Sequence, residues 1–395
     1  MNVYVRELSR HLARSGWQID VFTRLQDAEM APFCIRDDHG YRTVHVPAGP
    51  NATVDRRQAF DLLPEFVEGM RTFVRQEGLT YDLIHSHYWL SGWVAGQLAP
   101  EWRVPVVHMF HTLGRMKDLV AGKDDPREAA NRAQVEQDIL GYADRIVAAT
   151  PLDRQQTVTL YRVDQSKIAV IPCGVNLELF RPIDQRQARR ELGLPADRSM
   201  LLFVGRLDPV KGLNVLLEAM CELTRRMRPR RAQDLSLAII GGDREDHLEA
   251  MMTDLKCLSD IRHELGLDDL VVFVGSRAQE ALPCYYSAAD ACVMPSLYES
   301  FGMVALEAMA CGTPVIASRV GGLTYTVRDG ETGFLVPEKN PKALAEKLEL
   351  ILTDKSLRDR LGTRATRVAR TYGWETVADE IQRLYAELGV VSVPA

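Results

Sequence analysis

Short apolar runs alternate with amphipathic stretches along almost the whole chain, and this alternation restricts its fold more than any other feature. Runs such as Leu201–Gly205 and Leu235–Ile240 are rich in Val, Ile and Leu, unlike a strand that keeps one polar face in water. Strands of this kind are buried on both faces and need helices to cover them. The pattern therefore predicts an α/β fold built from doubly wound sheets.

The predicted strands form two series, which indicates two sheets. The first series is Ile19–Thr23, Thr43–Pro47, Leu83–His87, Val104–Phe110, Arg145–Ala149 and Ile168–Pro172. The second series is Leu201–Gly205, Leu235–Ile240, Val271–Gly275, Ala291–Pro295, Pro314–Ser318 and Gly333–Val336. At 395 residues the chain is too long for one ordinary core and suits two domains of ~150–200 residues. We predict one Rossmann-like domain over 1–180, a second over 181–372 and a final helix over 373–389.

Composition argues against several classes of protein. The formal net charge is −6, whereas binding to the phosphate backbone of a nucleic acid needs a basic face. The seven cysteines are scattered and contain no CxxC pair, so neither a zinc site nor a disulfide framework is indicated. No apolar run is long enough to span a bilayer, and the N-terminus is not a signal peptide. These features favour a protein of the reducing cytoplasm with no nucleic-acid partner and no transmembrane segment.

The segment Phe203–Gly212 has the arrangement of a diphosphate site. A buried strand runs into a glycine, which is followed by Arg206 and then by Lys211 and Gly212 at the opening of a helix. A diphosphate needs close approach of the backbone and fixed cations at a helix N-terminus. The alternative is a surface turn with two solvated cations, because most Lys and Arg side chains are exposed.

Two carboxylates follow the predicted strand Ala291–Pro295. Ser300 can cap a helix over Phe301–Cys311, so that Glu299 lies in the loop before the helix and Glu307 in its second turn. The helix N-terminus suits a phosphate, and the two carboxylates could hold hydroxyl groups of an extended ligand. The alternative is an ordinary amphipathic helix with an exposed Glu.

Histidines follow two predicted strands of the first series. His85 and His87 point the same way if their strand continues, but no third ligand has the spacing of a metal site, so hydrogen-bonded residues at a strand end are favoured. His111 follows the next strand and is a candidate substrate contact. A hydrogen-bonded loop histidine is the alternative.

Taken together, these segments resemble the retaining GT-B glycosyltransferases of family 4, and the resemblance covers nearly the whole chain. It implies two Rossmann-like domains with the active site in the cleft between them. The spacing of the two carboxylates argues against a non-hydrolysing epimerase of the same architecture. The motifs that carry the resemblance are Val170–Asn176, Gly205–Gly212, Ser287–Asp290, Pro295 with Ser296, Glu299 with Glu307, Gly312–Ala317 and Gly330–Val336.

The resemblance assigns the donor nucleoside diphosphate sugar to the second half of the chain. Arg206 and Lys211 match the residues that hold the diphosphate, while Glu299 matches a contact to the donor sugar. Glu307 matches the carboxylate that holds the ribose, and His111 matches a histidine against the reacting face of the sugar. The donor-binding set is Arg206, Lys211, Glu299, Phe301, Gly302 and Glu307, and the catalytic set is His111, Glu299, Arg206 and Lys211. Fixed cations stabilise the departing diphosphate, so no metal or other cofactor is obligatory, and a UDP sugar is the favoured co-substrate.

Within this family the first half looks most like the mycothiol-pathway glycosyltransferase and the sucrose-phosphate synthases. Those enzymes take phosphorylated acceptors. The matching phosphate contacts are Asn2, Tyr88, Thr112 and Arg132, and Arg56 stands where those enzymes carry a Lys. Arg keeps the positive charge of Lys with a different geometry.

The N-terminus departs from the family pattern. Residues Asn2–Arg14 form a predicted helix with Val5, Leu8 and Leu12 on one face, but no strand precedes it. Family members open with a strand that ends in Gly-Gly. We expect that the first strand is missing here and that the natural protein begins upstream of Met1, the alternative being an unusual fold at this end.

These inferences combine into one functional prediction. We expect a retaining transferase that moves a hexose from a nucleoside diphosphate sugar to a phosphorylated polyol or sugar. A sucrose-phosphate synthase or sucrose synthase is the alternative within the class, and a non-catalytic sugar-nucleotide-binding protein is the alternative outside it. The expected partners are a nucleotide sugar and a small phosphorylated acceptor. The sequence leaves open whether the chain forms a homodimer.

Overall fold

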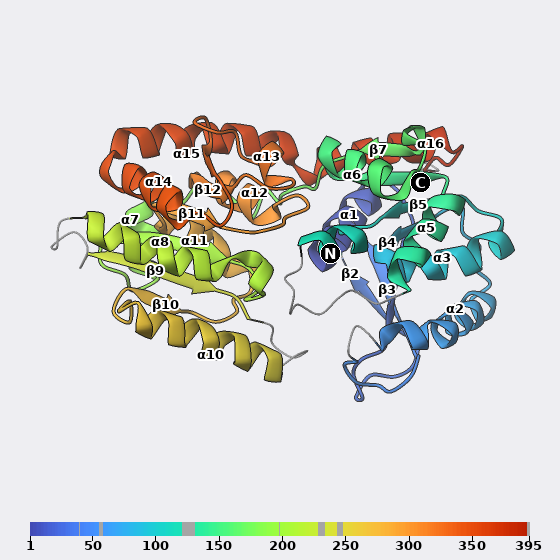
Figure 1. Cartoon of the computed structure of the whole chain (residues 1–395). Coiled ribbons are helices and arrows are strands. Elements are labelled where there is room, and N and C mark those ends of the chain that lie inside the picture. Colours follow the sequence, from blue (N-terminus) through green and yellow to red (C-terminus); the bar gives the residue numbers. More distant parts are fainter. Residues whose placement is uncertain are drawn as a thin grey trace. The chain divides into compact units, whose positions relative to one another are not determined.

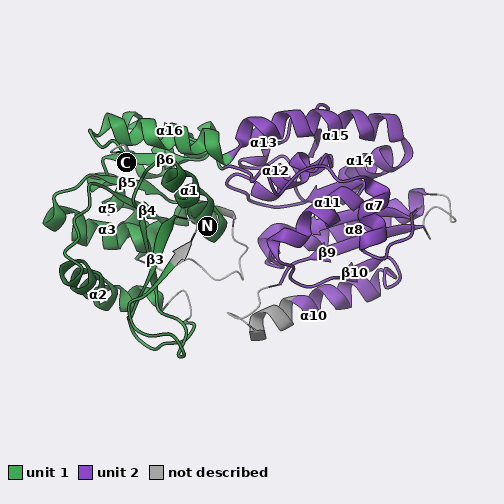
Figure 2. Ribbon diagram, turned by 180° about the vertical axis from the view of Figure 1, so that it is seen from behind, with its two compact units in different colours: residues 1–173, 374–395 green, residues 174–373 purple. Residues whose placement is uncertain are grey.

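The computed structural model describes residues 1–38, 40–54, 58–120, 131–196, 198–227, 234–242 and 248–392. The chain divides into two units, which Figure 2 colours separately. Unit 1 contains Met1–Cys173 together with Trp374–Ala395, and unit 2 contains Gly174–Gly373. The first change of unit comes before the predicted boundary at residue 180, because Val175 forms a β-bridge to Gly373 within unit 2.

The described residues of unit 1 form two sheets (Figure 1). A four-stranded parallel sheet has the order β4 (Ile84–His87), β5 (Val106–Met109), β6 (Arg145–Ala148), β7 (Ile168–Val170). A three-stranded sheet has the order β1 (Asp20–Arg24), β3 (Tyr41–Val46), β2 (Cys34–Asp38). In this second sheet β1 is parallel to β3 and β2 is antiparallel to it.

The helices of unit 1 cover these sheets and join their cores. Helix α3 carries apolar residues all round because Trp89 and Ala95 pack into one buried cluster while Val94 and Leu98 pack into another. The first cluster includes residues of β5 and β6, and the second includes residues of β3. The helices are α1 (Asn2–Arg14), α2 (Leu63–Gln76), α3 (Tyr88–Trp102), α4 (Gly114–Val120), α5 (Arg132–Tyr142), α6 (Pro151–Tyr161) and α16 (Trp374–Glu387).

The first and last helices of unit 1 lie against each other. The ring of Tyr4 in α1 meets the ring of Trp374 in α16 edge-on, with the ring centroids 5.0 Å apart. Leu8 and Leu12 of the predicted apolar face are buried, and the Trp17 indole donates a hydrogen bond to Gln382. These contacts explain why the C-terminal segment belongs to the same unit as the N-terminus.

In unit 2 the part of the chain that the structure describes forms one six-stranded parallel sheet. Its order is β10 (Val271–Phe273), β9 (Leu235–Ile240), β8 (Ser199–Val204), β11 (Ala291–Met294), β12 (Val315–Ser318), β13 (Gly333–Val336). The chain runs outward from β8 to β10 and then returns to the other side of β8, so the strand order reverses between β8 and β11. In open α/β sheets the crevice outside the carboxyl ends of the strands at such a point binds ligands.

Helices cover both faces of this sheet (Figure 1). The core is formed by buried apolar side chains of the strands and of α8 and α14, such as Leu216, Leu237 and Leu348. The helices are α7 (Gln185–Glu191), α8 (Leu213–Arg226), α10 (Leu248–Glu264), α11 (Leu282–Ala288), α12 (Met303–Ala310), α13 (Leu323–Thr326), α14 (Pro341–Thr353) and α15 (Lys355–Ala369).

The structure confirms the doubly wound α/β prediction and corrects three details. The first series of strands, for which one sheet is predicted, divides between a three-stranded and a four-stranded sheet, because β3 pairs with β1 and β2 and not with β4. Every predicted strand overlaps an observed one, but β2 has no counterpart in the prediction. The helix expected over Phe301–Cys311 with Ser300 as its cap instead begins at Met303, after Gly302. Gly302 has a φ of 91°, which ends the preceding loop in a left-handed turn that a helix starting at Phe301 would not contain.

Candidate functional site

In unit 2, Lys211 and Glu299 meet although they are far apart in the sequence. Lys211 precedes α8 and Glu299 lies in the loop between β11 and α12, so both follow the strands that flank the reversal of the sheet. The Lys211 Nζ atom lies 2.6 Å from Glu299 Oε2, with side chains 20% and 15% exposed. A partly exposed cation and carboxylate therefore neutralise each other beyond the carboxyl ends of these strands.

Arg206 takes a different position from Lys211. Its side chain is 54% exposed and forms an ion pair of 3.4 Å with Asp208, two residues along the loop. Both predicted diphosphate cations thus follow β8, but the structure joins only Lys211 to Glu299.

Glu307 is buried in α12. Its Oε2 atom accepts a hydrogen bond of 2.8 Å from the Tyr286 hydroxyl, and its Oε1 atom accepts one of 3.4 Å from the Gln279 amide. Burial raises the pKa of Glu307 to about 7, although the two hydrogen bonds favour the carboxylate and lower it. An isolated exposed Glu, the alternative from the sequence, does not describe this residue.

The loop before α12 is fixed by close backbone packing. Phe301 is buried with its ring 6.1 Å from that of Tyr372, and Gly302 precedes the first turn of the helix. The amide of Gly322 donates a hydrogen bond of 2.8 Å to the Glu299 carbonyl. A Cβ atom at Gly321 would lie 1.9 Å from the same carbonyl oxygen, so only glycine fits beside this loop.

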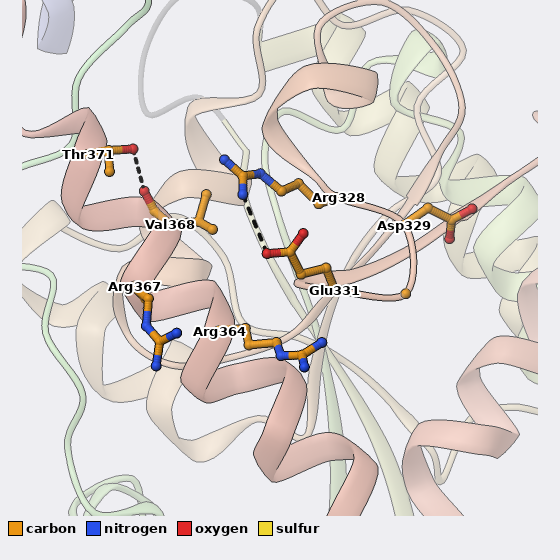
Figure 3. Close-up of a pocket in the computed structure, with 8 residues that line it drawn as sticks. Arg328, Asp329, Glu331, Arg364, Arg367, Val368 and Thr371 are labelled. Carbon is orange, nitrogen blue, oxygen red and sulfur yellow. Dashed lines mark hydrogen bonds and ion pairs between the residues drawn. The ribbon is translucent and has the colours of Figure 1, made fainter.

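A surface depression of unit 2 lies elsewhere (Figure 3). It is lined by the residues that precede β13, among them Arg328 and Glu331, and by Arg364 and Arg367 of α15. The strands of the sheet are parallel, so this depression lies at their amino ends, opposite the loops that hold Lys211 and Glu299. It is therefore separate from the candidate site.

In unit 1, Arg132 gathers two of the other predicted acceptor residues around its guanidinium. Its Nη1 atom donates to the Tyr88 hydroxyl at 3.1 Å, and its Nη2 atom donates to the Thr112 carbonyl at 2.6 Å and to Thr112 Oγ1 at 3.2 Å. Arg132 is fully buried and forms an ion pair of 2.7 Å with Glu136, one helical turn away. We call Tyr88, Thr112 and Arg132 the arginine cluster.

Strained backbone surrounds the arginine cluster. Tyr88 has a φ of 74° and His111 a φ of 60°, values that are unfavourable for residues other than glycine. Tyr88 directly follows the carboxyl-terminal end of β4, and His111 lies two residues beyond that of β5. Backbone strain of this kind is concentrated at functional sites, where the surrounding structure over-determines it.

The predicted histidines form a contact chain beside this cluster. His87 Nδ1 lies 3.2 Å from His111 Nε2, and the rings of His85 and His87 stack with centroids 4.4 Å apart. Burial lowers the pKa of His111 to about 3, so the imidazole is neutral at physiological pH. Tyr4 meets the His111 ring edge-on at 5.1 Å between centroids.

Of the remaining predicted residues, the structure describes Asn2 but not Arg56. Asn2 opens α1 with an exposed side chain and, within the part of the chain that the structure describes, donates no side-chain hydrogen bond to the arginine cluster. Arg56 lies outside the described residues. Among the described residues no group of His, Cys, Asp or Glu has the arrangement of a metal site. His85 and His87 are among the residues to which this applies.

The sequence does not point to the residues that hold Arg132 and Glu307 in place. Glu136 could have been found as the i+4 partner of Arg132 on a helix. Tyr161, whose hydroxyl donates to Glu136, and Tyr286, whose hydroxyl donates to Glu307, carry no sequence signal. These tyrosines reach the carboxylates only through the fold.

Comparisons with known proteins identify the family. The model described as "Glycosyltransferase Family 4" matches residues 1–179, and the one described as "Glycosyl transferases group 1" matches residues 184–368. The D-inositol 3-phosphate glycosyltransferase of Kineococcus radiotolerans is 40% identical over 98% of this chain and 89% of its own length. The chain belongs to the glycosyltransferase family that includes this enzyme. The D-inositol 3-phosphate glycosyltransferase of Frankia alni is 41% identical, over 98% of this chain and 93% of its own.

Solved structures show the same fold for this glycosyltransferase. The sucrose-phosphate synthase of Thermosynechococcus elongatus superposes with a TM-score of 0.89 and 38% identity, covering 98% of this chain and 93% of its own. Anabaena HepE in complex with UDP and glucose superposes with a TM-score of 0.76 at 20% identity, covering 98% and 95% of the two chains, which shows the GT-B fold alone.

No helix among the described residues of this glycosyltransferase combines the length and the apolar character needed to cross a membrane.

Proposed function

We propose that this glycosyltransferase moves a hexose from a nucleoside diphosphate sugar, with retention of configuration, to a phosphorylated polyol or sugar. Unit 2 holds the donor and unit 1 holds the phosphate of the acceptor. The observation that carries the proposal is the arginine cluster, in which a fully buried guanidinium faces the hydroxyls of Tyr88 and Thr112. A buried Arg with two neighbouring hydroxyl donors is suited to a phosphate, because Arg presents several N–H groups in a fixed fork.

The donor assignment rests on Lys211, Glu299 and Glu307. A bound diphosphate would take Lys211 as its counter-ion, which releases the Glu299 carboxylate to accept a hydrogen bond from a sugar hydroxyl. Glu307 lies one turn along α12, where its buried carboxylate would accept from the ribose hydroxyls. Anabaena HepE, which shares the fold, was solved with UDP and glucose, and this makes uridine nucleotides the first donors to test.

The proposed step exchanges one bond at the anomeric carbon. The bond from this carbon to the diphosphate oxygen breaks, and the electron pair leaves with the diphosphate. The acceptor hydroxyl oxygen forms the new bond on the same face, and its proton passes to an oxygen of the departing phosphate. Arg206 and Lys211 would stabilise the charge that develops on this group, as preorganised cations do. The neutral His111 imidazole would contact the sugar as a hydrogen-bonding group without adding charge.

A paired experiment tests this function. Thermal unfolding in the presence of UDP, GDP and ADP sugars identifies the donor, because ligand binding raises stability with the logarithm of its excess over Kd. Steady-state kinetics with that donor then compare myo-inositol 3-phosphate with myo-inositol. We expect a kcat/KM at least ~10-fold higher for the phosphorylated acceptor, since a charge-assisted hydrogen bond contributes about 1.5–3 kcal/mol. Equal use of both acceptors contradicts the proposal, and donor binding without any turnover supports a non-catalytic sugar-nucleotide-binding protein.

Sucrose-phosphate synthesis is the second candidate. Its support is the superposition with the Thermosynechococcus enzyme, which has nearly the same identity to this chain as the inositol phosphate enzymes have. Both reactions need a phosphate site of the kind that the arginine cluster offers. Fructose 6-phosphate in place of myo-inositol 3-phosphate, with the same donor panel, decides between them.

A further inference from the structure

We infer that Glu136 and Tyr161 are positioning residues, which fix the guanidinium of Arg132 in the orientation that selects a phosphorylated acceptor. This inference rests on the proposed function, because it concerns the phosphate site of the same enzyme. Neither residue belongs to the arginine cluster. Their effect on the acceptor passes through Arg132.

Glu136 is held from three sides. Its Oε1 atom accepts a hydrogen bond of 2.7 Å from Arg132 Nε, and the Gly114 amide donates to Oε1 and Oε2 at 3.0 and 3.1 Å. The Tyr161 hydroxyl donates to Oε2. Burial, helped by the neighbouring carboxylate, raises the pKa of Tyr161, so its hydroxyl stays protonated and keeps donating. The carboxylate is fully buried and has little freedom to move.

The contacts of Arg132 fix the direction of its guanidinium. The Nε edge is occupied by Glu136, whereas Nη1 and Nη2 extend to Tyr88 and Thr112. The guanidinium carbon also lies 4.9 Å from the centre of the Tyr88 ring. Because the guanidinium is planar, fixing Nε fixes the direction of both Nη groups as well.

The loop over the cluster is built around the same network. Gly114 bonds to Glu136 through its amide, and a Cβ atom at this position would lie 3.0 Å from the Arg132 side chain. Thr112, whose carbonyl accepts from Arg132, belongs to the same loop. Glu136 therefore fixes the orientation of the Arg132 side chain. It also fixes the position of the loop that brings Thr112 beside Arg132.

Charge compensation is a different role, and it makes the opposite prediction. If Glu136 only neutralised Arg132, its replacement by Gln would leave an uncompensated positive charge and strengthen the binding of phosphate. If Glu136 positions Arg132, the same replacement weakens the binding, because Gln offers one oxygen for the donors that a carboxylate accepts with two. Glu136→Gln thus separates the two roles by the sign of its effect.

The test uses the full chain with Glu136→Gln and the milder Tyr161→Phe, which removes only one hydroxyl. Glu222→Gln is the matched control, since Glu222 forms an i,i+4 pair with Arg226 on a more exposed helix surface of unit 2. Three quantities are measured: KM and kcat for myo-inositol 3-phosphate, kcat/KM for myo-inositol, and Ki for inorganic phosphate as a competitor of the acceptor. We expect a KM at least ~10-fold higher in Glu136→Gln and a few-fold higher in Tyr161→Phe, with kcat little changed and Ki raised in parallel.

The outcomes separate this inference from the proposed function. If the unmodified enzyme does not prefer the phosphorylated acceptor, the proposed function itself is wrong. If it does, but both variants lose kcat/KM equally for the two acceptors, Glu136 and Tyr161 act on the fold alone and the inference is overturned. A lower Ki for phosphate in Glu136→Gln also overturns it, in favour of charge compensation. Should Glu136→Gln fail to fold, the comparison of acceptors in Tyr161→Phe decides.

Discussion

At the scale of single residues, the pairing of Lys211 with Glu299 predicts how the donor site responds to mutation. Lys211→Ala removes the cation proposed to stabilise the departing diphosphate, and we expect turnover to fall on the order of 10²-fold. The exposed Lys355, paired with Asp359, offers a control, since Lys355→Ala should leave turnover unchanged. Near-normal kinetics in Lys211→Ala would rule out its proposed role.

The raised pKa of Glu307 predicts that donor binding depends on pH. Its pKa is raised to about 7 by burial, so the carboxylate is only partly ionised at neutral pH. The ionised form is the one proposed to accept hydrogen bonds from ribose, and affinity for a sugar nucleotide should therefore fall as the pH drops through about 7. Tyr286→Phe removes a donor to the carboxylate and should move this midpoint to higher pH.

Calorimetric titration of UDP-glucose between pH 5.5 and 8.5 measures this midpoint. Glu307→Gln is the control, because an amide does not titrate and its binding should lose this pH dependence. The same midpoint in the unmodified protein and in Tyr286→Phe would contradict the assignment.

At the scale of elements, the contact between the loops after β11 and β12 predicts a cost for any side chain at Gly321. A Cβ atom there would lie 1.9 Å from the Glu299 carbonyl oxygen, so Gly321→Ala must displace the loop that carries Glu299. Gly330 is the matched control, since its φ of 73° is also left-handed but nothing lies within 4 Å of its Cβ position.

We expect Gly330→Ala to cost about 1 kcal/mol of unfolding free energy from backbone strain alone, with unchanged donor affinity. Gly321→Ala should cost more and should also weaken donor binding. Urea unfolding and donor titration of both variants measure the difference. Equal stability loss with equal donor affinity in the two variants would show that the loop contact does not organise the site.

Particular elements show what the sequence could predict. The buried strands of both units were found because apolar runs between helical stretches have a strong pattern. Strand β2 lacks this pattern because more than half of Cys34–Asp38 is charged, as suits an antiparallel edge strand. The residue type of Ser300 predicts a helix cap, whereas the left-handed Gly302 decides where α12 begins. Pairings such as Lys211 with Glu299 arise only when separate loops meet.

At the scale of the whole molecule, buried histidines predict an acid sensitivity centred on unit 1. Burial lowers the pKa of His85, His87, His108 and His111, to about 3 for His85 and His111. As the pH falls below 6.5, the unfolded chain binds protons that the folded chain does not. Each of these histidines then lowers the free energy of unfolding by about 1.4 kcal/mol per pH unit, until the pH reaches its folded pKa.

Hydrogen exchange and urea unfolding between pH 7 and pH 5 measure this loss of stability in acid. The strands β4 and β5 should lose protection before the strands of unit 2 do. His108→Gln should flatten the dependence of unfolding free energy on pH, because glutamine does not titrate. Parallel slopes for the unmodified protein and His108→Gln would show that the buried histidines do not control acid stability.

We propose that this glycosyltransferase transfers a hexose with retention to an acceptor that it recognises by its phosphate. Proton NMR of a single reaction mixture tests it most directly, with the donor sugar nucleotide and equal amounts of myo-inositol 3-phosphate and myo-inositol. We predict one new anomeric signal, with the configuration of the donor, on the phosphorylated acceptor. Product formed equally on both acceptors, or product with the inverted configuration, would contradict the account.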